Sequence, residues 1–169
     1  HDALPIFVGP PISQMMTGLG SIINWATEQR PFIMGIVVSV VMGMVLTLPI
    51  SSAALGIILN LSGLAAGAAT IGCCCNMVGF AVASYRENKF GGLVAQGLGT
   101  SMLQVPNIMR HPLIWLPVIF SSAILGPVST ILANMQNNAT GSGMGSAGLV
   151  GQITTYQTRS EEHTSELQS

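Results

Sequence analysis

Charged residues are scarce in this chain: Asp, Glu, Lys and Arg together make up 7% of its 169 residues. Ordinary soluble domains contain roughly 25% of these residues, so the chain lacks the composition of a solvated surface. The net charge is −1 and no basic patch is present. Aromatic residues make up only 5% and do not alternate with basic ones. These absences argue against nucleic acid as a partner.

Acidic residues are missing from the long apolar stretches. An enzyme embedded in a membrane needs an acid/base pair, so we expect no catalytic residues in this chain. Cys73, Cys74 and Cys75 are consecutive. On a helix, neighbouring side chains point about 100° apart, so these three cannot converge on one metal ion. We therefore expect neither a metal site nor a cofactor.

Hydrophobic residues make up 49% of the chain, and its mean hydropathy is +0.61. The clearest apolar stretches are Phe32–Leu48, Ser51–Tyr85 and Leu113–Met135. The length allows about four to six crossings of a bilayer at roughly 20 residues each. Gly126-Pro127 predicts a break within the last stretch. The sequence thus predicts an all-α fold, a polytopic transmembrane helix bundle with broken or re-entrant helices.

Residues 5–25 show helical periodicity with two stripes. The apolar stripe consists of Ile12, Met15, Leu19 and Ile22, and the polar stripe of Gln14, Thr17, Ser21 and Asn24. Such a helix either lies flat on the membrane or crosses it with its polar side against other helices, and the pattern leaves both open. Pro5, Pro10 and Pro11 predict that the beginning of this segment is not regular helix.

The stretch QGLGTSMLQVPNIMRH, residues 96–111, is rich in amides and hydroxyls but lies between apolar stretches. If it is one helix, spacings of three and four bring the following residues to one face: Gly92, Gln96, Thr100, Gln104 and Asn107. Pro106 is expected to break that helix, and Arg110 and His111 to end it. A polar face amid so much apolar sequence suits a membrane protein that binds a polyhydroxylated solute.

Residues 51–85 are too long for one crossing, and we expect either two helices joined near residues 64–70 or one crossing plus a re-entrant piece. Asn60 and Asn76 each lie among small residues. An amide in hydrocarbon needs a partner, so both are expected to face the protein interior. The pattern does not decide between a structural bond between helices and contact with a solute. The glycine-rich segment at residues 136–145 suits close approach of the backbone to a ligand or a helix.

Four stretches carry a resemblance to a known family: LPISSAALGI, NLSGLAAGAATIGCCCNMVGFAVASYREN, GGLVAQGLGTSMLQVPNIMRHPLIW and MQNNATGSGMGSAGLVGQ. They resemble the membrane permease subunit, enzyme IIC, of bacterial phosphoenolpyruvate-dependent sugar phosphotransferase systems, in its compact stand-alone form. The resemblance covers nearly all of residues 4–156. It implies a multi-pass protein of the bacterial inner (plasma) membrane and a homodimer. It also implies that the protein binds a sugar, carries it across the lipid bilayer and presents it to a phosphocarrier subunit, IIB, supplied by IIA.

The resemblance leaves sugar binding to this chain and phosphoryl transfer to its partner. Sugars present hydroxyls and nearly apolar ring faces, which amides and a histidine can bind. The substrate-binding candidates are Asn76, Gln96, Gln104, Asn107, His111, Gln136, Asn137 and Asn138. The alternatives are an uncoupled channel or transporter for a small polar solute, and a membrane sensor that binds sugar without moving it.

Residues 159–169, RSEEHTSELQS, differ from the rest of the chain. They hold three of the six acidic residues and have no apolar periodicity. They read like a translated sequencing-adapter oligonucleotide joined in frame. We therefore expect a partial permease domain in residues 1–158, as a fragment of a longer protein, followed by a non-native tail.

Overall fold

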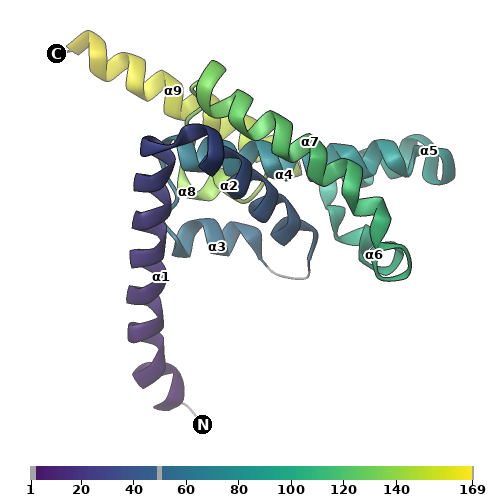
Figure 1. Ribbon diagram of the computed structural model, residues 1–169, viewed down its shortest axis with the longest axis horizontal. Helices are drawn as coiled ribbons and strands as arrows, with labels where there is room; N and C mark the ends of the chain where they lie inside the picture. Colours follow the sequence, from purple (N-terminus) through teal and green to yellow (C-terminus); the bar gives the residue numbers. More distant parts are fainter. Residues whose placement is uncertain (1–2, 49–50, 169) are drawn as a thin grey trace.

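The computed structural model describes residues 3–48 and 51–168, which are almost wholly helical (Figure 1). Within these ranges no β-strand occurs, and an isolated bridge joins Gly63 and Asn137. The α-helices are α1 (Ala3–Gln29), α2 (Pro31–Thr47), α3 (Ser52–Ile58), α4 (Gly63–Ala83), α5 (Tyr85–Val94), α6 (Val105–Arg110), α7 (Trp115–Pro127), α8 (Ala139–Ser142) and α9 (Val150–Gln168). The predicted all-α helix bundle is confirmed.

Five short helices of other types interrupt this order. Two are π-helices, η1 (Ala95–Gly99) and η4 (Val128–Leu132). Three are 3₁₀-helices, η2 (Ser101–Gln104), η3 (Pro112–Ile114) and η5 (Ala147–Leu149). Most of them follow glycine, proline or polar residues, so the broken helices that the sequence predicted are present.

Two helical stretches in the described part of the chain are long and apolar enough to cross a membrane. They are α4, at 21 residues, and the continuous η3–α7–η4 segment Pro112–Leu132, also 21 residues. Helix α2 is apolar but shorter, at 17 residues. Length and apolarity therefore single out fewer spans than the four to six that the chain length allows.

Helices α2, α4 and α7 pack against one another and form the centre of the fold. Small residues bring their backbones close: a side chain at Gly72 would collide with the backbone of Ser39, and one at Gly126 with Gly35 and Ser39. Ser39 Oγ also donates to the carbonyl of Ser122 at 2.8 Å. Around these contacts lies an apolar cluster built mainly from α2 and α4 that includes Met42 and several alanines. Close packing of small residues is the usual basis of helix association in lipid.

The two helices predicted within residues 51–85 are present, but they meet at residues 59–62 rather than near 64–70. Asn60 has a φ of 50° and Gly63 a φ of 56°, so the chain turns through the left-handed region at this point. Ser51 begins α3 by accepting a hydrogen bond from the amide of Ala54. The turn chemistry of Asn60 and Gly63 thus sets the boundary.

The polar stretch at residues 96–111 is not the single helix that the sequence predicted. Thr100 is extended, with φ −154° and ψ 141°, and its hydroxyl accepts from the amide of Met102 at 3.2 Å. Thr100 therefore separates η1 from η2, because its side chain caps the second segment instead of continuing the first. Pro106 lies in the first turn of α6, where a missing N–H costs little, so it begins a helix and does not break one.

Two further expectations concern proline, and one of them differs from the structure. Helix α1 runs through Pro10 and Pro11 from Ala3 onward, so the predicted irregular start is wrong. At Gly126-Pro127, where the sequence predicts a break or kink, the helix changes type. Helix α7 ends at Pro127 and continues as the π-helix η4, where the Ala133 amide donates to the Val128 carbonyl five residues earlier at 3.1 Å.

Candidate functional site

Two neighbouring cavities lie beside α6. The His111 cavity has a volume of about 370 Å³. Its lining includes the polar side chains of Glu87, Gln104, Asn107 and His111 and the apolar side chains of Ile114 and Pro117. The Gln96 cavity, of about 490 Å³, is lined by Asn88, Gln96, Gln104 and Asn107 together with three small residues and Leu103. Gln104 and Asn107 border both cavities. The structure thus brings together four of the predicted site residues, although not on one helical face.

Gln96 lies in the π-helix η1 and is 2% exposed. Its Oε1 is buried and has no hydrogen-bond partner. Leaving a buried carbonyl oxygen unpaired costs about 1–3 kcal/mol. No other buried side-chain nitrogen or oxygen among the described residues is in this state. Gln96 thus lines a polar cavity and holds an acceptor that no group of the protein uses.

Gln104 and Asn107 form a fixed pair between the two cavities. Gln104 is 4% exposed, and its Oε1 accepts from Asn107 Nδ2 at 2.9 Å. The bond spans three residues, from the end of η2 to the first turn of α6. Asn107 and His111 are exposed, and the His111 amide donates to the Asn107 carbonyl at 2.8 Å. The buried glutamine therefore orients an exposed amide and, through the backbone of α6, the histidine at its end.

Glu87 is a member of the site that the sequence analysis did not propose. It lies in the first turn of α5, is exposed, and lines the His111 cavity. A carboxylate accepts hydrogen bonds from sugar hydroxyls more strongly than an amide does. The sequence held a signal: Glu87 is the one acidic residue between Glu28 and Glu161. A carboxylate in a short charged segment is also typical of a solvated loop, so the sequence alone does not assign Glu87 to a site.

Asn76 is fully buried in α4 and has partners for both ends of its amide. Its Nδ2 donates to the Gly72 carbonyl at 3.0 Å and to Ser122 Oγ at 3.3 Å. Its Oδ1 accepts from Thr47 Oγ1 at 3.4 Å and from Trp115 Nε1 at 3.3 Å. These bonds connect α2, α4 and α7. Asn76 lines neither cavity, and its contacts are those of a structural residue.

A link runs from this core to the polar stretch. Thr47 Oγ1, which bonds Asn76, also shares a hydrogen bond of 3.2 Å with Ser101 Oγ. Ser101 begins η2, which ends at Gln104. On the other side, Ser146 Oγ donates to the carbonyl of Gly97 in η1 at 2.5 Å. Both ends of the segment that carries Gln96 and Gln104 are therefore tied to the helix bundle.

The three remaining candidates lie elsewhere, before and at the start of α8. Asn137 is 1% exposed, and its Nδ2 donates to Thr70 Oγ1 at 2.7 Å and to the Gly151 carbonyl at 3.2 Å. Asn138 caps α8 by accepting from the Gly141 amide at 2.8 Å. Gln136 donates to Glu162 at 3.1 Å. The structure does not bring these residues to the cavities beside α6, and their side chains bond to the protein itself.

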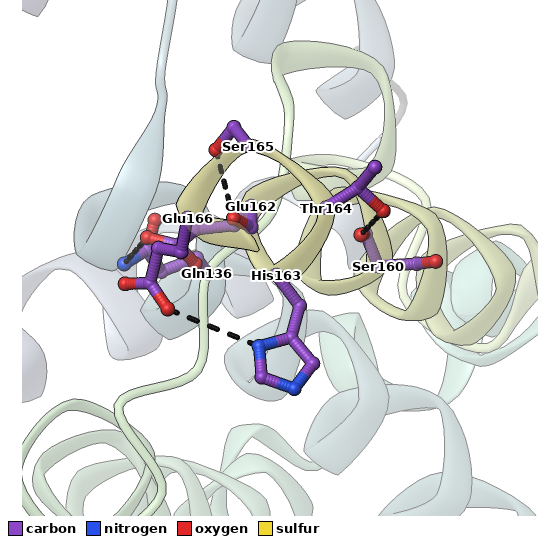
Figure 2. A network of polar contacts seen from close by, with 7 residues as sticks. All are labelled: Gln136, Ser160, Glu162, His163, Thr164, Ser165 and Glu166. Carbon is purple, nitrogen blue, oxygen red and sulfur yellow. Dashed lines mark hydrogen bonds and ion pairs between the residues drawn. The ribbon is translucent and has the colours of Figure 1, made fainter. Parts of the chain in front are cut away.

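A third cavity, of about 720 Å³, borders Gln136 and residues of α9 between Tyr156 and Leu167. Figure 2 shows its polar side chains on the last turns of α9, where His163 Nδ1 lies 3.8 Å from a carboxylate oxygen of Glu166. Both side chains are more than 70% exposed, at 79% and 74%. Most of the wall belongs to the segment from residue 159 onward that the sequence assigns to a non-native tail, of which Ser169 lies outside the described residues. We therefore assign this cavity no function.

The cysteines lie within α4. Cys73 is fully buried, and its Sγ donates to the carbonyls of Met42 and Ser142, each at 3.6 Å. Among the described residues no group of three His, Cys, Asp or Glu side chains is placed to hold a metal ion. The cysteines act here as small packing residues between helices.

One comparison with known proteins gives a match. The family model described as "Phosphotransferase system, EIIC" matches residues 2–167, nearly the whole chain. No curated protein and no solved structure matches it.

Proposed function

This chain belongs to the phosphotransferase system EIIC family, the membrane subunits of sugar permeases, and on that premise we propose a site and a mode of action for it. The protein binds a sugar in the two cavities beside α6 and carries it across the bilayer. The sugar is then phosphorylated by a IIB partner at the expense of phosphoenolpyruvate. The setting is the bacterial inner membrane, with the chain passing through it several times as part of a homodimer.

The observation that carries the site is that Gln96 lines a polar cavity and has a buried Oε1 with no hydrogen-bond partner. A sugar hydroxyl that donates to this oxygen removes the cost of leaving it unpaired. Gln104 and Asn107 supply further amide groups between the cavities. Apolar Ile114 and Pro117 offer a surface for the ring face. The arrangement suits a neutral, polyhydroxylated ligand.

Glu87 and His111 are the titratable side chains that line the His111 cavity. In phosphorylation by the partner, a sugar hydroxyl oxygen forms a bond to phosphorus as the bond between phosphorus and the IIB side chain breaks. The hydroxyl proton must pass to a base or to water. Glu87 and His111 are exposed. A soluble partner can reach only a site that is exposed in this way. In this proposal they position the hydroxyl and accept its proton.

The proposal is tested with the protein in sealed vesicles and a panel of radiolabelled hexoses, hexitols and disaccharides. Coupled permease action predicts uptake of one sugar only when phosphoenolpyruvate, the general phosphocarriers and IIA and IIB are present, with sugar phosphate as the product. Uptake without these components indicates an uncoupled transporter. Binding without any uptake indicates a sensor.

The same vesicles test the site. We expect Gln96→Leu and His111→Ala to lose sugar binding, and Asn138→Ala to retain it, because Asn138 caps α8 away from both cavities. Equal binding by all three variants would place the sugar elsewhere.

A further inference from the structure

Helix α1 presents three distinct faces between residues 14 and 28. Each helical residue advances about 100° around the axis, and the centres of the three faces lie roughly 120° apart. The docked face contacts the rest of the protein and consists of Met16, Gly20, Ile23 and Thr27. The apolar face is exposed and consists of Met15, Leu19, Ile22 and Trp25. The polar face is also exposed and consists of Gln14, Thr17, Ser21 and Glu28.

The docked face fixes the helix rigidly at one end. A side chain at Gly20 would collide with the carbonyl of Leu59. Asn24 Nδ2 donates to the Asn60 carbonyl at 2.9 Å, and Asn24 Oδ1 accepts from the Ser62 amide at 3.2 Å. Asn24, which the sequence grouped with the polar stripe, therefore anchors α1 to the turn between α3 and α4. These contacts determine where the other two faces point.

Figure 1 shows α1 upright and α4 lying across its direction, whereas α7 runs obliquely to both. Helices α4 and α7 are the candidate membrane spans. If α4 crosses the bilayer near the normal, α1 lies close to the membrane plane rather than along the normal. Of the two arrangements that the sequence left open, the packing thus favours a helix that lies flat on the membrane.

The apolar face is too exposed for a water-soluble surface helix: Met15 is 66%, Ile22 63% and Trp25 64% exposed. A helix in the membrane plane beside a bundle needs one face toward the bundle, one toward the acyl chains and one toward water. The three faces of α1 meet that requirement. Tryptophan is enriched at the depth where acyl chains meet headgroups, and Trp25 lies at the edge of the apolar face.

We propose that α1 is an interfacial helix whose apolar face is inserted among the lipid acyl chains, with its polar face toward water. Within α1, Glu28 is the one charged residue of the described part, and Arg30 follows the helix. Insertion is therefore driven by apolar surface and not by attraction to anionic headgroups. The proposal rests on the chain being a membrane protein and is independent of the sugar site.

Trp25 supplies a direct test, because the chain has two tryptophans and the other, Trp115, is replaced in Trp115→Phe. This variant is reconstituted into phosphatidylcholine vesicles that contain lipids brominated at shallow or at deep positions of the acyl chain. We expect shallow bromines to quench Trp25 several-fold more strongly than deep ones. Adding phosphatidylglycerol is expected to leave the quenching unchanged. Quenching by aqueous iodide alone, or strongest quenching by the deep bromines, overturns the proposal.

A second experiment measures the orientation of α1. Single cysteines are placed in a Cys73→Ala, Cys74→Ala, Cys75→Ala background, and a membrane-impermeant maleimide is added to inside-out and right-side-out vesicles. We expect Gln14→Cys and Glu28→Cys to react in the same vesicle type, and the matched Leu19→Cys and Ile22→Cys to be at least tenfold slower. Reaction of Gln14→Cys and Glu28→Cys in opposite vesicle types shows a spanning helix and overturns the proposal. A disulfide between two copies through Ile22→Cys also overturns it, because a second copy then covers the apolar face.

Discussion

At the scale of single residues, two buried amides of similar sequence context have different roles. Asn76 and Gln96 both follow small residues in apolar surroundings, and the sequence proposed both as sugar ligands. In the structure Asn76 has partners from three helices, whereas Gln96 Oε1 has none. Pairing of an amide depends on what distant segments bring to it. Sequence periodicity therefore identified buried amides but could not separate the structural one from the candidate ligand.

The contrast between these amides gives a stability prediction. Gln96→Leu is expected to leave the free energy of unfolding unchanged or to raise it by about 1 kcal/mol, because it removes an unpaired buried carbonyl. Asn76→Leu is expected to lower it by more than about 2 kcal/mol, because it leaves donors and acceptors on three helices without a partner. Both are measured by denaturant unfolding in mixed micelles. Equal losses would mean that Gln96 is paired in the folded protein.

Glu87 gives a second prediction at this scale. Glu87→Gln keeps the size of the side chain but removes its charge, so we expect sugar affinity to fall about tenfold while the fold is retained. Glu28→Gln is the matched control, since Glu28 is exposed on α1 and lines neither cavity. Affinity is measured by equilibrium dialysis. An unchanged affinity in Glu87→Gln would remove the carboxylate from the site.

At the scale of elements, the sequence predicted packing better than helix continuity. The four-residue spacing of Gly35, Ser39, Gly43 and Thr47 predicts a ridge for close helix contact, and in the structure all four pack against α4 or the α7–η4 segment. The prediction for the polar stretch at residues 96–111 was wrong, because a single polar face requires 3.6 residues per turn throughout. The π turns of η1 and the cap at Thr100 break that register. Capping by the Thr100 hydroxyl is a local hydrogen bond that the periodicity of the sequence does not predict.

The small-residue contact between α2 and α4 can be tested directly. Gly72→Val is expected to lower the free energy of unfolding by about 3 kcal/mol, because the new side chain collides with the backbone of Ser39 and the helices must separate. Gly18→Ala is the control: nothing lies within 4 Å of the added carbon, and alanine favours the helix by up to about 1 kcal/mol. Thermal unfolding in detergent compares the two. Similar melting temperatures would show that α2 and α4 are not in close contact.

At the scale of the whole molecule, composition predicted a helical membrane bundle, and the family match with the helical structure confirms that class. The number of membrane crossings was harder to predict from the sequence than the fold class. The length of an apolar stretch does not by itself distinguish a membrane-spanning helix from a buried helix or one that lies in the membrane plane. Helix α1 shows this: its two-sided pattern fitted both orientations, and only its docking on α3 and α4 distinguishes them.

The tail also belongs to this scale. Ending the chain after Thr158 is expected to leave the melting temperature and sugar binding unchanged, because residues 159–167 continue α9 with exposed side chains. This truncation also removes the exposed hydrogen bond from Gln136 to Glu162. Gln136→Ala in the full chain controls for the loss of that bond. A truncated protein that no longer binds sugar would make the tail part of the functional domain.

The central claim is that sugar occupies the cavities beside α6, and Gln104 tests it most directly because it borders both cavities and orients Asn107. The measurement is the dissociation constant of Gln104→Ala for the sugar that the wild-type protein binds, in folded protein of matched melting temperature. The account predicts at least a tenfold weaker affinity, equivalent to about 1.4 kcal/mol. A dissociation constant equal to that of the wild-type protein would contradict it.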